Sequence, residues 1–194
     1  MNEAKAEAAR ARAREYLLKN GTQATVSAIR ARTGAAMEAL ERFLDTAPPA
    51  LAARHAIEGE WTLHEIVDHL VETHRPTLDE LWCLLAGQRP PGEPIPAGLQ
   101  SKAPLTRPWP WLLGEMKRVH ADILEALSAV PPDFTTDARA PLVMVVNVED
   151  EAGRTVPLSW VEELDWKAYA IVLRLHALDH LNQAKKILAA TQAS

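Results

Sequence analysis

Apolar residues recur at helical spacing in several long segments of the chain. Positions three and four residues apart on a helix share one face, so this pattern predicts helices that bury one side. The first predicted segment is alanine-rich and charged, and it is expected to be helical because of its residue propensities. The predicted helices span residues 3–18, 25–45, 62–86, 111–130 and 161–190.

Two segments carry the capping-box pattern that marks a helix start. Thr62 and Glu65 form a T-x-x-E box, and Trp61 before it can pack on Ile66 as a hydrophobic staple. Ser159 and the glutamate three residues later form an S-x-x-E box. Both patterns predict that a long helix begins there.

The segments between the helices predict a long connection and a small hairpin. Seven prolines between Gly87 and Pro110 rule out a regular helix and indicate a semi-rigid crossover. Such a crossover joins parallel neighbours in a four-helix bundle, and it can also fold over one end as a lid. Between Ala140 and Leu158, β-branched residues flank a short acidic, glycine-containing loop, which predicts two strands.

These elements predict an all-α fold. We expect a four-helix bundle with a long crossover loop, a small β-hairpin insertion and an extra N-terminal helix. Residues 1–22 would form an N-terminal helical arm, and residues 23–194 the bundle domain.

The last predicted helix carries a histidine pair on its apolar face. At about 100° per residue, His176 and His180 fall in an arc roughly 80° wide, shared with Tyr169, Val172, Leu173, Gln183 and Ile187. Histidines at i and i+4 direct two nitrogen ligands to one point, as a divalent metal such as Zn, Ni or Fe requires. The pair by itself is a weak signal, so the hypothesis needs a third ligand.

His69 is the candidate for that third ligand. It lies at the edge of the apolar face of the 62–86 helix, a position between core and cavity that suits a metal ligand. The competing candidate, His74, is better explained as a core histidine or as part of a channel wall. We expect further residues near the histidines to line the pocket: Glu65, Thr73, Tyr169 and Gln183.

Bulk properties restrict the class of protein. The 194 residues suffice for one domain with a sizeable core, and the net charge of −5 argues against a nucleic-acid-binding surface. The strongly apolar run Leu142 to Val146 is too short to span a bilayer, and no signal peptide is visible. The single cysteine, Cys83, excludes an intramolecular disulfide framework and is expected to be a small buried hydrophobe. We therefore expect a soluble, cytoplasmic protein.

The motifs together resemble a known family. The string Trp61-Thr-Leu-His-Glu65-Ile-Val-Asp-His69-Leu, followed about a hundred residues later by His176-x3-His180, resembles the DinB-like superfamily of metalloenzymes. The part from Trp61 to His74 is most similar to the branch that includes the bacillithiol S-transferases. The resemblance implies a metal held by His69, His176 and His180.

Three imidazole ligands would leave at least one coordination position open, which is typical of a catalytic site. The metal could activate a thiol, as the resemblance implies, or a water molecule for hydrolysis. We therefore expect a thiol S-transferase-like enzyme that acts on a small molecule, with a metal-dependent hydrolase as the alternative. A non-catalytic metal-binding or scaffold protein is the third hypothesis. A second apolar surface on the last helix suggests a homodimer, and it comprises Ile171, Leu175, Leu178 and Leu181.

Overall fold

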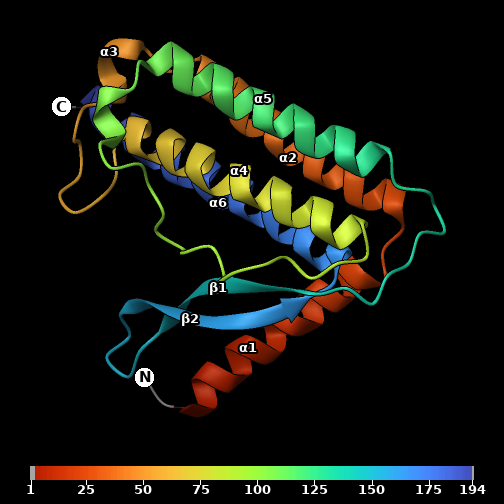
Figure 1. The fold of residues 1–194 in the computed structure, drawn as a ribbon. Coiled ribbons are helices and arrows are strands. Elements are labelled where there is room, and N and C mark those ends of the chain that lie inside the picture. Colours follow the sequence, from red (N-terminus) through yellow and green to blue (C-terminus); the bar gives the residue numbers. More distant parts are fainter. Residues whose placement is uncertain (1–2, 194) are drawn as a thin grey trace.

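The computed structural model describes residues 3–193, which are mostly helical with a small antiparallel hairpin (Figure 1). This confirms the predicted class of a helical fold with a hairpin. The elements are α1 (Glu3–Leu17), a π-helical turn η1 (Leu18–Thr22), α2 (Val26–Asp45), α3 (Pro49–Ala52), α4 (Leu63–Leu85), a 3-10 turn η2 (Pro104–Thr106), α5 (Trp109–Ser128), β1 (Ala140–Glu149), β2 (Thr155–Leu164) and α6 (Trp166–Ala193).

The helices α2, α4, α5 and α6 pack against one another, and we call them the bundle. α2 contacts α5 and α6, and α4 contacts the same two helices from the other side. The apolar stripes predicted from the sequence face inward here, and their residues form one continuous core. Fully buried members from the four helices include Ile29, Met37, Leu40, Leu70, Leu112, Ile123 and Ala184.

The connection between α4 and α5 is a crossover. The two helices run in the same direction, and residues 86–108 return along α4 to the end where both begin (Figure 1). α2 and α6 run in the opposite direction (Figure 1). The proline-rich segment therefore does what its length predicts, because parallel neighbours need a long connection.

The capping box at the start of α4 has formed. The backbone N–H of Thr62 donates to Glu65 Oε2 at 2.8 Å, and Glu65 N–H donates to Thr62 Oγ1 at 3.1 Å. The helix then continues through Pro76, which has no N–H to donate to the preceding turn. Thr77 Oγ1 donates to the carbonyl of Thr73 at 2.7 Å in that same turn.

The prediction of a second capping box is wrong. Ser159 and Glu162 lie in β2, where they pair with Val145 and Leu142 of β1. Because β1 offers ten residues of backbone to pair with, the ladder prevails over a local cap pattern. α6 therefore begins at Trp166 and not at residue 161. Asp165 caps it, because its carboxylate accepts from the N–H groups of Lys167 at 2.9 Å and Ala168 at 3.0 Å.

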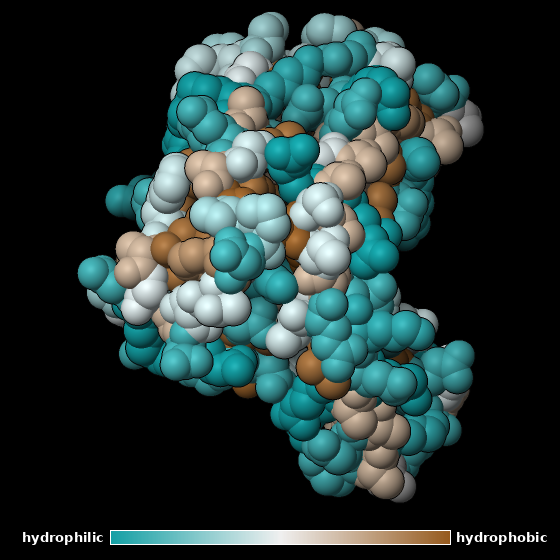
Figure 2. Space-filling view, turned by 90° about the vertical axis from the view of Figure 1, so that its right-hand side faces the viewer, coloured by the Kyte–Doolittle hydropathy of each residue, from teal (hydrophilic) through white to brown (hydrophobic). Residues whose placement is uncertain are grey.

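α1 and the hairpin form a smaller layer beside the bundle. Ala6 and Ala9 of α1 pack against Leu158 of β2 in a small separate apolar cluster. Figure 2 shows this layer projecting below the bundle, with apolar residues only in small groups on a mainly hydrophilic face. The proposed boundary at residue 22 falls at the end of η1 and stays a prediction.

The apolar surface behind the homodimer prediction is largely covered within the chain. Ile171 and Leu181 are buried, while Leu175 and Leu178 are partly buried against the core. The homodimer stays a prediction.

Cys83 is only partly buried, which corrects the expectation of a fully buried thiol. Within residues 3–193, no helix has both the length and the apolar character needed to cross a membrane.

Gly21 in η1 allows the chain to approach α6 closely. A Cβ at this position would lie 2.7 Å from the Cα of Ala168, an overlap with backbone that side-chain motion cannot relieve. We expect Gly21→Ala to lower the free energy of unfolding by about 1–3 kcal/mol. Chemical denaturation measures the effect.

Gly114→Ala is the matched control. This glycine lies inside α5, and its added Cβ would meet no atom within 4 Å. The substitution should raise the free energy of unfolding by about 0.5–1 kcal/mol. Equal effects of the two substitutions would contradict the close approach of η1 to α6.

Candidate metal centre

Three histidines from α4 and α6 converge inside the bundle. His69 lies on α4, and His176 and His180 lie one turn apart on the antiparallel helix α6. The Nε2 atom of His176 is 3.0 Å from Nε2 of His69 and 3.0 Å from Nε2 of His180. His69 is buried and the other two are partly buried. The structure thus brings together the three residues that the sequence predicts as metal ligands.

The hydrogen bonds of the other ring nitrogens decide which atoms face the centre. Nδ1 of His69 lies 2.7 Å from the carbonyl oxygen of Leu99, which can only accept. Nδ1 of His180 lies 2.9 Å from Oε1 of Gln183. Both Nδ1 atoms therefore carry the proton of a neutral ring, and both Nε2 atoms present lone pairs to the centre.

This donor set fits a divalent metal. Lone pairs that face one another at such short range repel unless a cation lies among them. Nitrogen ligands bind zinc at about 2.0–2.1 Å, which places two tetrahedral ligands roughly 3.3 Å apart. The three ligand atoms all lie within 4.8 Å of one another, so this group could hold a metal ion.

Trp61 forms one wall of the centre. Its ring centroid is 4.9 Å from that of His69, and it is stacked on His180 at 6.2 Å with an angle of 11° between the planes. The capping pattern predicts Trp61 as a staple for the start of α4, and the structure also places it against two of the three rings. Its place immediately before the cap fixes it two turns from His69, and this spacing was the available signal.

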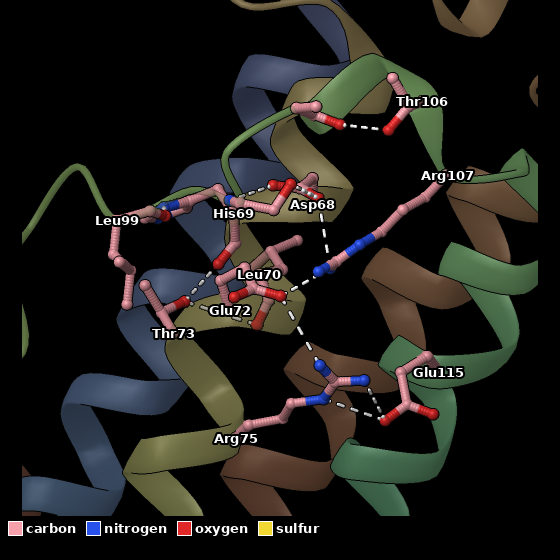
Figure 3. A network of polar contacts seen from close by, with 12 residues as sticks. Asp68, His69, Leu70, Glu72, Thr73, Arg75, Leu99, Thr106, Arg107 and Glu115 are labelled. Atoms are coloured by element: carbon pink, nitrogen blue, oxygen red, sulfur yellow. Dashed lines mark hydrogen bonds and ion pairs between the residues drawn. The ribbon is translucent and has the colours of Figure 1, made fainter.

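The crossover segment is fastened beside the histidines. Leu99 accepts from His69, and the next residue, Gln100, donates to the carbonyl of Glu65 at 3.1 Å. Ser101 donates to the carboxylate of Asp68 through its backbone N–H at 2.8 Å and its hydroxyl at 2.7 Å (Figure 3). Asp68 is fully buried, so these bonds satisfy a charge that would otherwise be costly inside the fold.

A chain of ion pairs continues from Asp68 across α4 to α5. Arg107 lies 3.4 Å from Asp68 and 2.5 Å from Glu72 (Figure 3). Arg75 lies 3.6 Å from Glu72 and 2.8 Å from Glu115. The pairs of Arg107 hold the end of the crossover against α4, and together with the bonds of Leu99, Gln100 and Ser101 they attach the segment at several points.

The predicted pocket residues have different positions. Gln183 contacts His180 directly, whereas Glu65 caps α4 and Thr73 donates to the carbonyl of His69 at 2.7 Å. Tyr169 is fully buried about two turns before His176, and its hydroxyl donates to Glu80. The structure therefore brings Gln183 to the His180 ring and shows the other three in a cap, a backbone bond and the core, and their role in lining a pocket stays a prediction.

His74 is buried, as the core role predicted for it requires, and it also contacts the outer nitrogen of His176. Its Nε2 lies 2.9 Å from Nδ1 of His176, and it is 1% exposed. The helical projection places His74 near the middle of the apolar face of α4, which identifies it as inward-facing. The projection alone cannot show which helix it meets.

The sequence profile of the DinB superfamily matches residues 32–164, more than half of the chain. This chain belongs to the DinB superfamily. The matched part includes His69 and His74 and ends before α6, so His176 and His180 lie outside it. Neither the curated proteins nor the solved structures contain a significant match to the chain.

Burial keeps the histidines of this DinB-superfamily protein neutral. Desolvation lowers the pKa of His69, and desolvation followed by the proximity of His69 lowers the pKa of His180 to about 4. Desolvation and the neighbouring imidazoles hold the pKa of His176 well below its usual value. Neutral imidazoles are the form that binds metal, so the fold favours metal binding at neutral pH.

Asp68→Ala should release the crossover. The substitution removes the acceptor for Ser101 and the partner of Arg107, and it should lower the free energy of unfolding by about 1–3 kcal/mol. Trypsin should then cut after Lys102, an exposed residue next to Ser101, faster than in the unmodified protein. Asp79→Ala, on an exposed face of the same helix, is the control. Equal cleavage rates in the two variants would contradict the fastening role of Asp68.

The metal-free protein should lose stability as the pH falls from about 6.5 to about 4. Over this range an unfolded chain protonates its histidines, whereas folded His180, with its pKa of about 4, stays neutral. The unfolded state binds more protons, so lower pH favours unfolding. Glu115 has little effect at pH 5 and above, because Arg118 holds its pKa at about 2 and the stability it contributes is lost between about pH 4.5 and pH 2.

Thermal melting of chelated protein at pH 7, 6 and 5 measures this effect. His180→Gln removes one of the responsible groups, so its melting temperature should depend less on pH. Identical pH profiles for the two proteins would show that burial of His180 does not contribute.

Proposed function

We propose that this protein is a metal-dependent enzyme of the thiol S-transferase type, with His69, His176 and His180 as the metal ligands. The observation that carries the proposal is the convergence of three imidazole Nε2 atoms, with 3.0 Å from His176 to each of the others. The second ring nitrogens of His69 and His180 are engaged by Leu99 and Gln183. The rings are therefore held in the orientation that a bound metal needs.

Three neutral ligands leave the full charge of a divalent ion in the site and at least one coordination position open. When bound, such a metal would lower the pKa of a coordinated thiol, so that a thiolate is available to attack an electrophile. His176 and His180 are partly exposed, which supports approach of a small molecule from their side. Trp61 stacks on His180 and covers one face of that ring.

The stretch from Trp61 to His74, which resembles the branch that includes the bacillithiol S-transferases, favours a thiol over water as the nucleophile. In the part of the chain that the structure describes, the ligand group contains only histidines and no carboxylate. Three-histidine sites can also activate water, which keeps hydrolysis as the alternative. A thiol has a much lower pKa than water, so a bound metal would deprotonate it more readily.

His69→Ala should abolish stoichiometric metal binding and thiol transfer while the fold is retained, because the large core supplies the stability. Elemental analysis gives the metal content, circular dichroism the fold, and a panel of low-molecular-weight thiols with an aryl halide the activity. His55→Ala, which changes an exposed histidine outside the bundle helices, should leave all three unchanged.

The outcomes separate the hypotheses for this site. Metal-loaded protein that hydrolyses model esters but transfers no thiol would make it a hydrolase. Metal-loaded protein inactive in both assays would make it a metal-binding protein without turnover. Equal metal content in the unmodified protein and the His69→Ala variant would refute the ligand assignment itself.

A further inference from the structure

A line of side chains leads from the candidate metal centre across the whole bundle. Nδ1 of His176 lies 2.9 Å from Nε2 of His74, and Nδ1 of His74 lies 3.1 Å from Nε2 of His120. Nδ1 of His120 lies 2.6 Å from Oε1 of Glu41. Each of the four helices contributes one member, because Glu41 is on α2, His74 on α4, His120 on α5 and His176 on α6.

The interior of this line is sealed from solvent. His74 and His120 are each 1% exposed, so water does not supply them with other partners. The Glu41 side chain is 24% exposed, so the far end of the line lies at the edge of the core. The two middle rings must therefore satisfy their nitrogens along the line.

The carboxylate fixes the direction of the hydrogen bonds. A carboxylate can only accept, so Nδ1 of His120 must donate to Glu41. A neutral imidazole has one N–H, so Nε2 of His120 accepts from Nδ1 of His74. Nε2 of His74 in turn accepts from Nδ1 of His176. His176 is then left with a bare Nε2, the atom that faces His69 and His180.

Hydrogen bonds in the opposite direction would be unfavourable at both ends of the line. A lone pair on Nδ1 of His120 would face the Glu41 carboxylate at 2.6 Å, which is repulsive. At the other end, Nε2 of His176 would carry a proton and could not bind a metal. The hydrogen-bond direction that Glu41 requires is thus the one that leaves Nε2 of His176 free to bind a metal.

We propose that Glu41 is a positioning residue for the metal centre, which sets the tautomer and the basicity of His176 through His120 and His74. This inference rests on the proposed function, in which His176 is a metal ligand. Carboxylates that orient a ligating histidine directly are a common feature of metal sites, and losing one costs about 10- to 100-fold in metal affinity. Here the same effect passes through two intervening rings, and we call the line from Glu41 through His120 and His74 to His176 the relay.

Glu41→Gln tests the relay. The amide has nearly the same shape, but it can donate as well as accept and carries no charge, so it no longer fixes the direction. Zinc alone is the probe, with its dissociation constant measured by competition with a chromophoric chelator. We expect binding to weaken about 10-fold or more. The matched control is Glu38→Gln, which makes the same charge change on an exposed residue of α2 paired with Arg42, and it should leave the dissociation constant unchanged.

The tautomer of each ring is a second readout. Nitrogen-15 NMR of the zinc-loaded, unmodified protein should show the proton on Nδ1 in His176, His74 and His120, and in Glu41→Gln these tautomers should become mixed. A purely structural role for Glu41 would lower the melting temperature without changing the tautomers.

A failure of the proposed metal centre and a failure of the relay give different results. If the unmodified protein binds no zinc, the proposed metal centre is wrong and the relay has no ligand to orient. If it binds zinc, but Glu41→Gln binds equally tightly or the NMR shows His120 protonated on Nε2, the relay is wrong while the metal centre stands.

Discussion

The mutual repulsion of imidazole lone pairs is the constraint on which the centre of this protein depends. Rings brought together at 3.0 Å will rotate or exchange tautomers unless each is held by its second nitrogen. Each Nδ1 has a different kind of partner: a backbone carbonyl for His69, an amide for His180 and another imidazole for His176. These partners come from the crossover, from α6 itself and from α4, so the arrangement of the elements is tied to the orientation of three rings.

The sequence predicts those parts of the structure that depend on local periodicity. The helical stripes, the T-x-x-E cap of α4 and the inward-facing histidine pair follow from spacing along one helix. The two capping-box patterns show that local spacing is not sufficient to predict every helix start. Thr62 and Ser159 start similar motifs, but Ser159 has a ten-residue strand to pair with and lies in β2. A local pattern cannot reveal which distant segment will compete for the same backbone groups.

The candidate site likewise has a part that local spacing predicts and a part that depends on distant contacts. His69, His176 and His180 can be found from helical projections, whereas the acceptors that orient them cannot. Leu99 contributes a backbone carbonyl, which leaves no trace in the residue type. The partnership of His74, His120 and Glu41 depends on the order in which four helices pack around the core. Residue identities alone leave that order open, since each of these side chains is also plausible at a solvated or simply buried position.

The separation of the three histidines along the chain has a consequence for the order of folding. His176 and His180 are brought together by α6 alone, as soon as that helix forms, whereas His69 joins them only after a loop of more than a hundred residues closes. A metal ion that meets the unfolded chain can therefore find two of its ligands early but not the third. Its full affinity arises only when α4 has docked against α6. If this docking follows the rate-limiting step of folding, metal uptake slows unfolding much more than it speeds folding.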